Sequence, residues 1–425
     1  STVATGDNNL TLDAGSAGNI TAASSITGGG AVVVTDGAVQ KYSGAITVDT
    51  LDIKDATTSV TLDGAVTTET TLDINSGGTL GQNAKVKAGT SVDYDSVGAL
   101  TINETIAATT VDIDATGVTT IADAGDITAS DAVTFGANKL GTVTTSGDID
   151  TSNDNVTFTR AVTLGGAVDI DTGSGGGDIS FSASIDGPRA LTLKTGTGDA
   201  TFTGAVKELT GLTVDTSGTL KTIASVAVSG DVSLTVNDID LGSTLNAGTD
   251  TDKRDVSITG QSGRSMSVGS DTSNDIQIDN TELSNITAGS LTLETANKDI
   301  TVAGLVATDL SGIDDETGLK LDTGSGAGDI SFVSKDSILG ASLTTSSGTG
   351  SFVASAGVAT GTGVGLASGQ KLSITADDFT IGKKLDSGTA STTLSVFSTD
   401  RNLDLAGGDQ GDGADISSAE LALIT

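Results

Sequence analysis

The sequence predicts an all-β fold, a single elongated parallel β-helix (β-solenoid) of about 20 coils of roughly 21 residues. Three observations predict it. Short stretches place apolar residues at positions i and i+2, which gives each strand one apolar side suited to burial and one polar side suited to solvent. These stretches recur at a nearly constant interval, separated by turns of Gly, Ser, Thr, Asn and Asp. Phenylalanines recur at the same interval.

The repeating unit is clearest from Val168 to Phe202. There, VDID runs into the turn TGSGGG and then DISF, and LTLK runs into TGTG and then DATF. Each half is a short alternating strand, a glycine-rich turn and a second strand that ends in phenylalanine. Much of the chain consists of variations on this unit, which is typical of a solenoid.

The strand spacing defines three regions. Successive strands start at Leu51, Leu72, Val92, Val111 and Val133, which is one start for each expected coil. We therefore expect a regular solenoid over residues 51–352, preceded by looser first rungs or a cap in 1–50. Regularity weakens after Phe352, so residues 353–425 are expected to hold less regular rungs and a cap. Within them, SSAELALIT has a capping-box pattern from Ser417 to Glu420 that suits a short covering helix, whereas the alternation of Leu421, Leu423 and Thr425 would equally suit a last strand.

Two further repeats support this interpretation. Phe135, Phe158, Phe181 and Phe202 follow one another at about one coil each, and so do Phe332 and Phe352. If each coil adds one rung, these rings stack directly above one another. In addition, DTGSGGGDISF at 171–181 returns as DTGSGAGDISF at 322–332, which indicates that a block of rungs was duplicated.

Composition restricts the partners. The formal net charge is −35, with 58 glycines, no Cys, no His and 2% aromatic residues. Such a charge repels nucleic acid and anionic membranes, so neither is an expected partner. No apolar run approaches the ~18 residues that span a membrane, so we expect no membrane insertion. The chain begins at Ser1 rather than Met, which favours removal of a signal peptide and export.

One motif suggests a metal. GGDQGDGADI, residues 407–416, resembles the nonapeptide calcium repeat of secreted toxins, and Asp409, Asp412 and Asp415 would supply its oxygen ligands. Only one copy is present, whereas such sites are normally built from stacked copies, so an ordinary acidic turn is the alternative. We expect no other cofactor.

Other chemical motifs have structural explanations. Aspartates pair at i and i+2 in Asp112 with Asp114, Asp148 with Asp150 and Asp169 with Asp171. Their separation of about 6.6 Å suits glycoside hydrolysis, but because the pairs recur, a solvated outer face explains them better. The glycine-rich turns lack the following helix and the Lys-Ser/Thr ending of a phosphate loop, so they are interpreted as corners of the coil.

The segments GGDISFSASIDGPRALTLKTGTGDATFTGAV and LTVDTSGTL resemble repeats of filamentous-haemagglutinin-like adhesins and other very large exported bacterial surface proteins. The resemblance concerns repeat style and covers about a third of the chain. It implies a right-handed parallel β-helix located outside the cell, used for adhesion or for building surface fibres.

Three hypotheses for function follow. The first is a non-enzymatic structural protein of the bacterial cell surface, a fibre or filament subunit or an adhesin stalk that self-associates end to end through its terminal rungs. The second is a calcium-organised surface-layer or carbohydrate-binding protein, whose partner would be a surface polysaccharide. The third is a β-helix polysaccharide lyase or hydrolase, which the scarcity of basic and aromatic residues disfavours.

Overall fold

The computed structural model confirms the predicted fold, a parallel β-solenoid of about 18 turns with about 21 residues per turn. It describes residues 2–136, 141–249, 252–270, 274–314, 318–360, 370–405 and 413–425. Strands account for 55% of the chain and helices for 3%. The count of turns falls below the predicted 20 because several turns are long, such as the one that joins the paired positions Val256 and Leu291. The chain divides into two compact units, Ser1–Leu209 and Thr210–Thr425.

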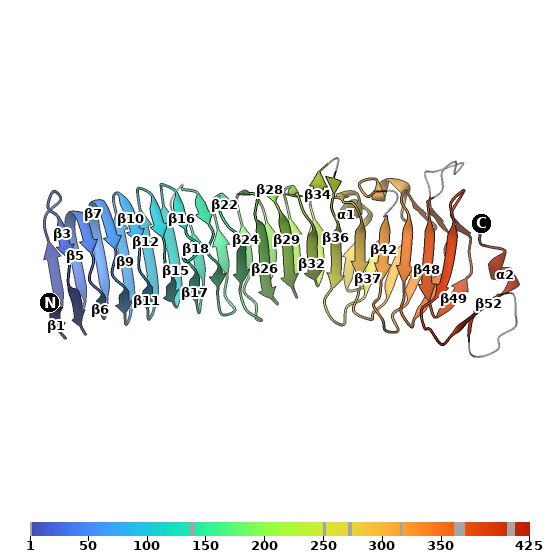
Figure 1. Cartoon of the computed structure of the whole chain (residues 1–425), viewed down its shortest axis with the longest axis horizontal. Helices are drawn as coiled ribbons and strands as arrows, with labels where there is room; N and C mark the ends of the chain where they lie inside the picture. Colours follow the sequence, from blue (N-terminus) through green and yellow to red (C-terminus); the bar gives the residue numbers. More distant parts are fainter. Residues whose placement is uncertain are drawn as a thin grey trace. The chain divides into compact units, whose positions relative to one another are not determined.

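In the first unit each turn contributes one strand to each of three faces (Figure 1). Successive strands of a face pair in parallel, so the backbone of each turn bonds to the turns before and after it. The first face consists of β1 (Thr2–Gly6), β4 (Ser25–Gly28), β6 (Ile46–Val48), β8 (Val66–Thr68), β11 (Val86–Ala88), β14 (Ile106–Ala108), β17 (Ile127–Ala129), β20 (Ile149–Asp150), β23 (Val168–Asp171) and β26 (Ala190–Gly196).

The other two faces of the first unit share the long strands β5 (Val32–Tyr42) and β7 (Leu51–Leu62), which bend from one face to the next. The second face also holds β2 (Leu10–Asp13), β9 (Thr71–Ser76), β12 (Ser91–Ser96), β15 (Thr110–Ala115), β18 (Val133–Phe135), β21 (Val156–Phe158), β24 (Ile179–Phe181) and β27 (Ala200–Phe202). The third also holds β3 (Ile20–Ala22), β10 (Thr79–Gln82), β13 (Leu100–Ile102), β16 (Thr119–Ile121), β19 (Val143–Thr145), β22 (Val162–Leu164), β25 (Ile185–Asp186) and β28 (Val206–Leu209).

The narrow core of the first unit contains the predicted phenylalanine ladder. Phe135, Phe158, Phe181 and Phe202 occupy one register position of the second face and are fully buried. Their ring centroids are 4.5, 4.9 and 5.6 Å apart and their planes nearly parallel. Alternation in each strand directs these rings inward, and in-register parallel pairing then places them above one another.

The prediction for Phe332 and Phe352 was wrong. Phe332 pairs with Ala354, and Phe352 pairs with Ile330, so the two rings are displaced by two residues along the strands. Their planes are inclined by 47° with centroids 5.9 Å apart. The residue that pairs with Phe352 in the following turn is Phe379. A regular interval along the sequence therefore does not fix the register when the intervening turns change.

Two tyrosines are buried in the first unit with an amide partner each. Tyr42 Oη donates to Gln40 Oε1 at 2.9 Å, and Tyr94 Oη donates to Gln82 Oε1 at 3.3 Å. Gln82 Nε2 in turn donates to the Glu104 carbonyl at 2.8 Å. Burial raises the pKa of both phenols far above their usual range. These pairs satisfy polar groups that would otherwise be costly inside the solenoid.

The second unit has one long face with the same inward and outward alternation. It consists of β29 (Gly211–Thr216), β32 (Val232–Val236), β36 (Val256–Gly260), β40 (Leu291–Glu294), β42 (Leu319–Asp322), β45 (Leu343–Ser346), β48 (Leu372–Ala376) and β51 (Thr392–Val396).

The remaining strands of the second unit form shorter faces. Their bounds are β30 (Thr219–Thr222) and β33 (Asp238–Leu241); β31 (Val226–Val228), β34 (Leu245–Thr249) and β39 (Ile286–Thr287); β37 (Met266–Gly269), β38 (Ile276–Ile278), β41 (Ile300–Ala303), β43 (Ile330–Phe332), β46 (Ser351–Ala354) and β49 (Asp378–Ile381); β44 (Ser337–Leu339), β47 (Val358–Thr360) and β50 (Leu385–Asp386); and β52 (Asn402–Leu405) and β53 (Gly413–Ile416).

Insertions interrupt the second unit. One of them includes β35 (Asp252–Lys253), which pairs antiparallel with the end of β34 through Gly248 with Lys253 and Thr249 with Asp252. A helix that the strand pattern does not predict, α1 (Asn280–Ser284), begins with a capping box of Asp279 and Glu282. A 3₁₀ helix, η1, covers Ala307–Leu310. The predicted C-terminal helix α2 (Ser418–Leu421) is present with the capping box of Ser417 and Glu420. Within the described part of the chain, none of these helices has the length and apolarity needed to cross a bilayer.

Candidate functional site

The predicted calcium motif lies largely outside the described residues, which include neither Asp409 nor Asp412. Asp415 is in β53, where it pairs with Asp404 of β52. In the described part of the chain, no group of three or more His, Cys, Asp or Glu side chains is arranged to hold a metal ion. Calcium binding through Asp409, Asp412 and Asp415 thus stays a prediction.

The paired aspartates do not share one environment. Asp114 is only 3% exposed, so it does not lie on the solvated face that the spacing suggests. Asp169 Oδ2 accepts from Lys194 Nζ at 2.7 Å. Asp171 Oδ1 accepts from the backbone N–H of Gly173 at 2.7 Å. Asp148 Oδ1 accepts the backbone N–H of Asp169 in the following turn. The pairs therefore do not form a repeated two-carboxylate centre.

Many aspartates at the corners of the coil bind the backbone of the next turn. Asp148 Oδ1 accepts the N–H of Asp169 at 2.8 Å, and Asp178 Oδ1 accepts the N–H of Asp199 at 2.8 Å. We call these contacts corner bonds. In the other corner bonds, a side-chain Oδ1 also accepts a backbone N–H of the next turn. The acceptors are Asp126, Asn155, Asp299 and Asp329, and the respective donors are the N–H groups of Asp148, Asp178, Asp329 and Ser351. Because a carboxylate that accepts an N–H gains a charge-assisted hydrogen bond, acidic side chains at corners stabilise the stacking of turns.

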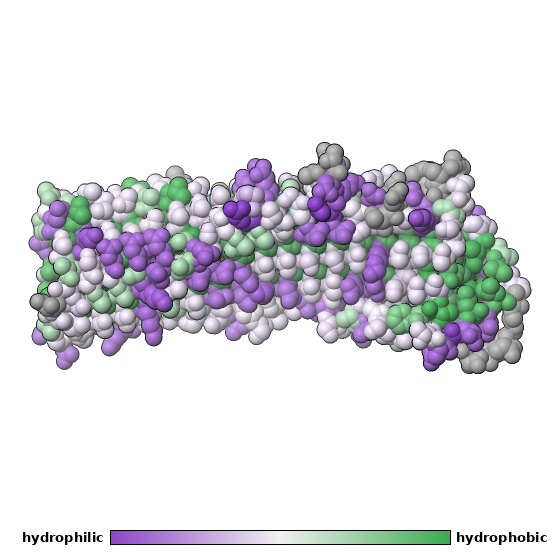
Figure 2. Space-filling model, viewed as in Figure 1, coloured by the Kyte–Doolittle hydropathy of each residue, from purple (hydrophilic) through white to green (hydrophobic). Residues whose placement is uncertain are grey.

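A column of four aspartates crosses the second face of the first unit. Asp52, Asp73, Asp93 and Asp112 occupy one register position of β7, β9, β12 and β15. Neighbouring strands are about 4.8 Å apart, so each carboxylate has a like charge directly above or below it. We call this the aspartate column. Figure 2 shows hydrophilic side chains gathered over these strands, where Figure 1 labels β9, β12 and β15.

The environment of this column disfavours ionisation. Desolvation, together with the charges of Asp73 and Asp112, raises the pKa of Asp93 to about 6. The pKa values of Asp73 and Asp112 are also raised, first by desolvation and then by neighbouring aspartates. Lys54 Nζ lies 3.5 Å from Asp52 Oδ2 at one end of the column. The column is therefore an acidic surface with incomplete charge compensation from the protein.

The glycine-rich turns are corners, as predicted. Gly173 and Gly324 occupy equivalent positions of the duplicated motif and have φ of +80° and +81°, which favours glycine. Gly175 N donates to Asn153 Oδ1 of the preceding turn, and Gly326 N donates to Asn297 Oδ1, both at 2.5 Å. These two N–H groups thus bond within the coil.

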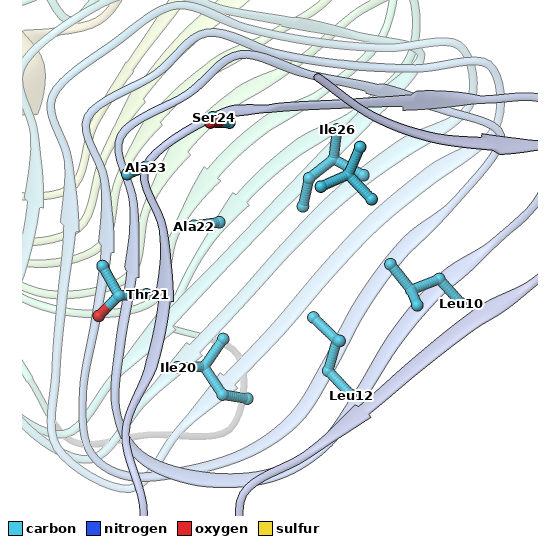
Figure 3. Close-up of a pocket in the computed structure, with 9 residues that line it drawn as sticks. Leu10, Leu12, Ile20, Thr21, Ala22, Ala23, Ser24 and Ile26 are labelled. Carbon is cyan, nitrogen blue, oxygen red and sulfur yellow. The ribbon is translucent and has the colours of Figure 1, made fainter. Parts of the chain in front are cut away.

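The N-terminal rung exposes part of the core. Leu10, Leu12 and Ile20 point into the interior of this rung, together with Ala22 and Ile26, whereas Thr21 points away from it (Figure 3). They line a hollow of about 370 Å³. Strand-paired residues one turn later, such as Val32 and Val34, are fully buried.

A second apolar surface lies at the C-terminal end of the second unit, where Figure 2 shows apolar side chains over the red strands of Figure 1. Phe397 is 37%, Leu405 56% and Leu421 42% exposed. The cap itself is held by backbone bonds, since Thr425 N donates to the Leu385 carbonyl and Leu385 N donates to the Leu423 carbonyl, both at 2.9 Å.

The fold defines the protein as a member of the structural class of parallel β-solenoids. In comparisons with known proteins, no protein family, no curated protein and no solved structure matches the chain. The resemblance to filamentous-haemagglutinin-like repeats stays a prediction.

Sequence reasoning missed Glu282. This half-buried residue of α1 accepts from the backbone N–H of Leu241 through Oε1 at 3.1 Å and from that of Asp279 through Oε2 at 3.0 Å. Desolvation raises its pKa to about 7, despite the two backbone bonds. The sequence contains the relevant signal, the D-x-x-E pattern of a capping box in 279–282.

Proposed function

We propose that this protein is a non-enzymatic structural protein of the bacterial cell surface, in which the β-solenoid serves as the subunit of a fibre or as the stalk of an adhesin. The observation that supports this proposal is that polar residues at the corners of the coil form hydrogen bonds within the solenoid. The corner aspartates and turn glycines, which could otherwise bind substrate, bond to neighbouring turns of the coil. They contribute to a scaffold that grows by adding rungs.

The experiment that tests this proposal is localisation combined with imaging. Antibodies against the purified protein should label the surface of intact source cells, and brief protease treatment of those cells should remove the label. Negative-stain images of native material should contain fibres or stalks. Label confined to the interior of the cell would contradict the proposal, whatever the purified protein does in solution.

A second candidate is a calcium-organised surface-layer or carbohydrate-binding protein. The aspartate column favours it through its charge, because four stacked carboxylates attract cations to that face, although the described carboxylates are not arranged as a metal-binding cluster. Isothermal titration calorimetry with Ca²⁺ should then give a binding isotherm for the unchanged chain. The double variant that combines Asp73→Asn with Asp93→Asn should bind Ca²⁺ more weakly. Asp131→Asn, which changes an exposed turn residue of the same unit, is the matched control. Identical isotherms for both variants would exclude the column as the binding surface.

A further inference from the structure

The short helix α1 is bonded to the end of β33 by two side chains. In a regular turn of the solenoid, the backbone N–H and C=O of a strand residue bond to the strand of the next turn. At Leu241 of β33 these two groups bond to α1 instead. The N–H donates to Glu282 Oε1 at 3.1 Å, and the carbonyl accepts from Nδ2 of Asn285, the C-cap of α1, at 2.9 Å. The helix thus takes the place of a strand beside Leu241.

α1 depends on its contacts with the coil. It has five residues, whereas isolated helices shorter than about 12 to 15 residues are marginal in water. Leu283 is its one buried side chain. On the side away from β33, Asn280 Nδ2 donates to Asp309 Oδ2 of η1 at 2.7 Å. Because so few contacts hold the helix, a change in one of them shifts the equilibrium between its docked and undocked states.

Glu282 is the contact whose charge can change. Its carboxyl group is half-buried and faces two other carboxyl groups, those of Asp279 in the capping box and Asp238 in β33. No cation among the described residues offsets this repulsion. Desolvation, together with these two charges, raises the pKa of Glu282 to about 7, although the N–H groups that it accepts lower it. Ionisation of Glu282 therefore weakens the docking of α1.

The other ionisable groups around α1 have partners of their own. Asp240 of β33 lies 3.2 Å from Lys221 Nζ, and Asp309 of η1 bonds to Asn280. The neighbouring strands β37, β38 and β39 contain no ionisable residue. Glu282 is therefore the group through which a change near neutral pH acts on α1.

We propose that α1 is a pH-sensitive latch on β33, which is closed in acid and opens as Glu282 ionises. In the undocked helix the carboxyl group is solvated and titrates at its ordinary pKa of 4.5, so the docked state binds the proton more tightly. The stability that this proton gives to the docked helix is complete below about pH 4.5 and is lost as the pH rises through about 7.

Opening of the latch changes the surface of the second unit. It frees the N–H and C=O of Leu241, and a free strand edge of this kind can bond another strand. It also exposes Leu283, which is fully buried in the docked helix. The inference goes beyond the proposed function and does not rest on it, because it concerns conformation and not location.

The test is hydrogen exchange of the full chain, followed by mass spectrometry at pH 5 and pH 8 and corrected for the intrinsic pH dependence of amide exchange. Protection of α1 and of the end of β33 should fall by at least about 10-fold between pH 5 and pH 8, which is the effect of one pKa unit. The full difference between the two pKa values is larger, but water screens a half-buried group. Peptides from β32 are the internal reference and should change less.

Two variants separate the charge of Glu282 from its contact with Leu241. Glu282→Gln keeps an oxygen that can accept the N–H of Leu241 but cannot ionise, so the difference between pH 5 and pH 8 should disappear. Asn285→Ala is the matched control, because it removes the other bond to Leu241 without changing a charge. Its protection should fall at both pH values, and the pH dependence should remain.

Circular dichroism of both variants establishes that the solenoid is intact. Equal protection of α1 at pH 5 and pH 8 in the unchanged chain overturns the proposal. A pH dependence that persists in Glu282→Gln also overturns it, because another group would then control the helix. Neither result affects surface localisation, so the proposed function is tested separately.

Discussion

Replacing Asp93 by asparagine will stabilise the solenoid at neutral pH. Asp93 is half-buried in the aspartate column, between Asp73 and Asp112. Its pKa is about 6 in the folded chain and 3.8 in the unfolded chain. Because the folded state binds the proton more tightly, ionisation of Asp93 as the pH rises through about 6 destabilises the fold. Asparagine keeps the shape of the side chain and removes the charge.

The magnitude follows from the pKa difference. At about 1.36 kcal/mol per pKa unit, the shift corresponds to about 3 kcal/mol for a fully shielded group. Asp93 is half-exposed, and water and salt screen its neighbours, so a gain of about 1 kcal/mol is expected at pH 8. For the unchanged chain, the contribution of Asp93 to stability is complete below pH 3.8 and is lost as the pH rises through about 6.

The assay is urea unfolding followed by circular dichroism at pH 8 and at pH 4, with hydrogen exchange of β12 as the local measurement. Asp93→Asn should be more stable than the unchanged chain at pH 8, and the difference should disappear near pH 4. Asp131→Asn, in an exposed turn of the same unit, is the control for replacing an aspartate outside the column. Equal stability of Asp93→Asn and the unchanged chain at pH 8, or a difference that persists at pH 4, would refute the reasoning.

Three further predictions concern the core and the corners. Phe158→Ala removes a ring stacked on both sides and should cost about 3 to 5 kcal/mol in urea unfolding, with Phe158→Leu costing clearly less. Tyr94→Phe leaves the Gln82 amide oxygen without its donor and should cost about 1 to 3 kcal/mol, an effect absent if water replaces the phenol. Gly173→Ala should cost about 1 kcal/mol or more because φ is +80°. Gly176→Ala in the same turn should be nearly neutral by thermal unfolding, because the added Cβ would meet only Thr197 Oγ1, at an ordinary contact distance of 3.9 Å.

The fold could be predicted because its information is local and periodic. Alternation in each strand sets the inward residues, and the repeat interval sets the rungs, so the ladder from Phe135 to Phe202 follows directly. Register is different. The residues between Phe332 and Phe352 determine the register in which β43 and β46 pair, and the interval between the two phenylalanines does not give that register.

The candidate sites were less predictable for a related reason. Spacing at i and i+2 gives the same description to Asp114, which is buried, and to Asp169, which binds Lys194. What distinguishes them is the content of adjacent turns, which is a property of the stack. The column of Asp52, Asp73, Asp93 and Asp112 likewise becomes visible only when register aligns residues that lie one turn apart along the chain.

Asn153 and Asn297 bond to equivalent glycines of the duplicated turns, but they lie at different distances from those glycines along the chain. Asn153 precedes the glycine that it binds by 22 residues, and Asn297 precedes its glycine by 29. The supporting residue lies outside the eleven-residue echo, so the copied segment included at least the turn before it. The additional length falls in the stretch that contains η1. A solenoid thus accommodates additional residues at one corner while an equivalent Asn–Gly contact still joins adjacent rungs.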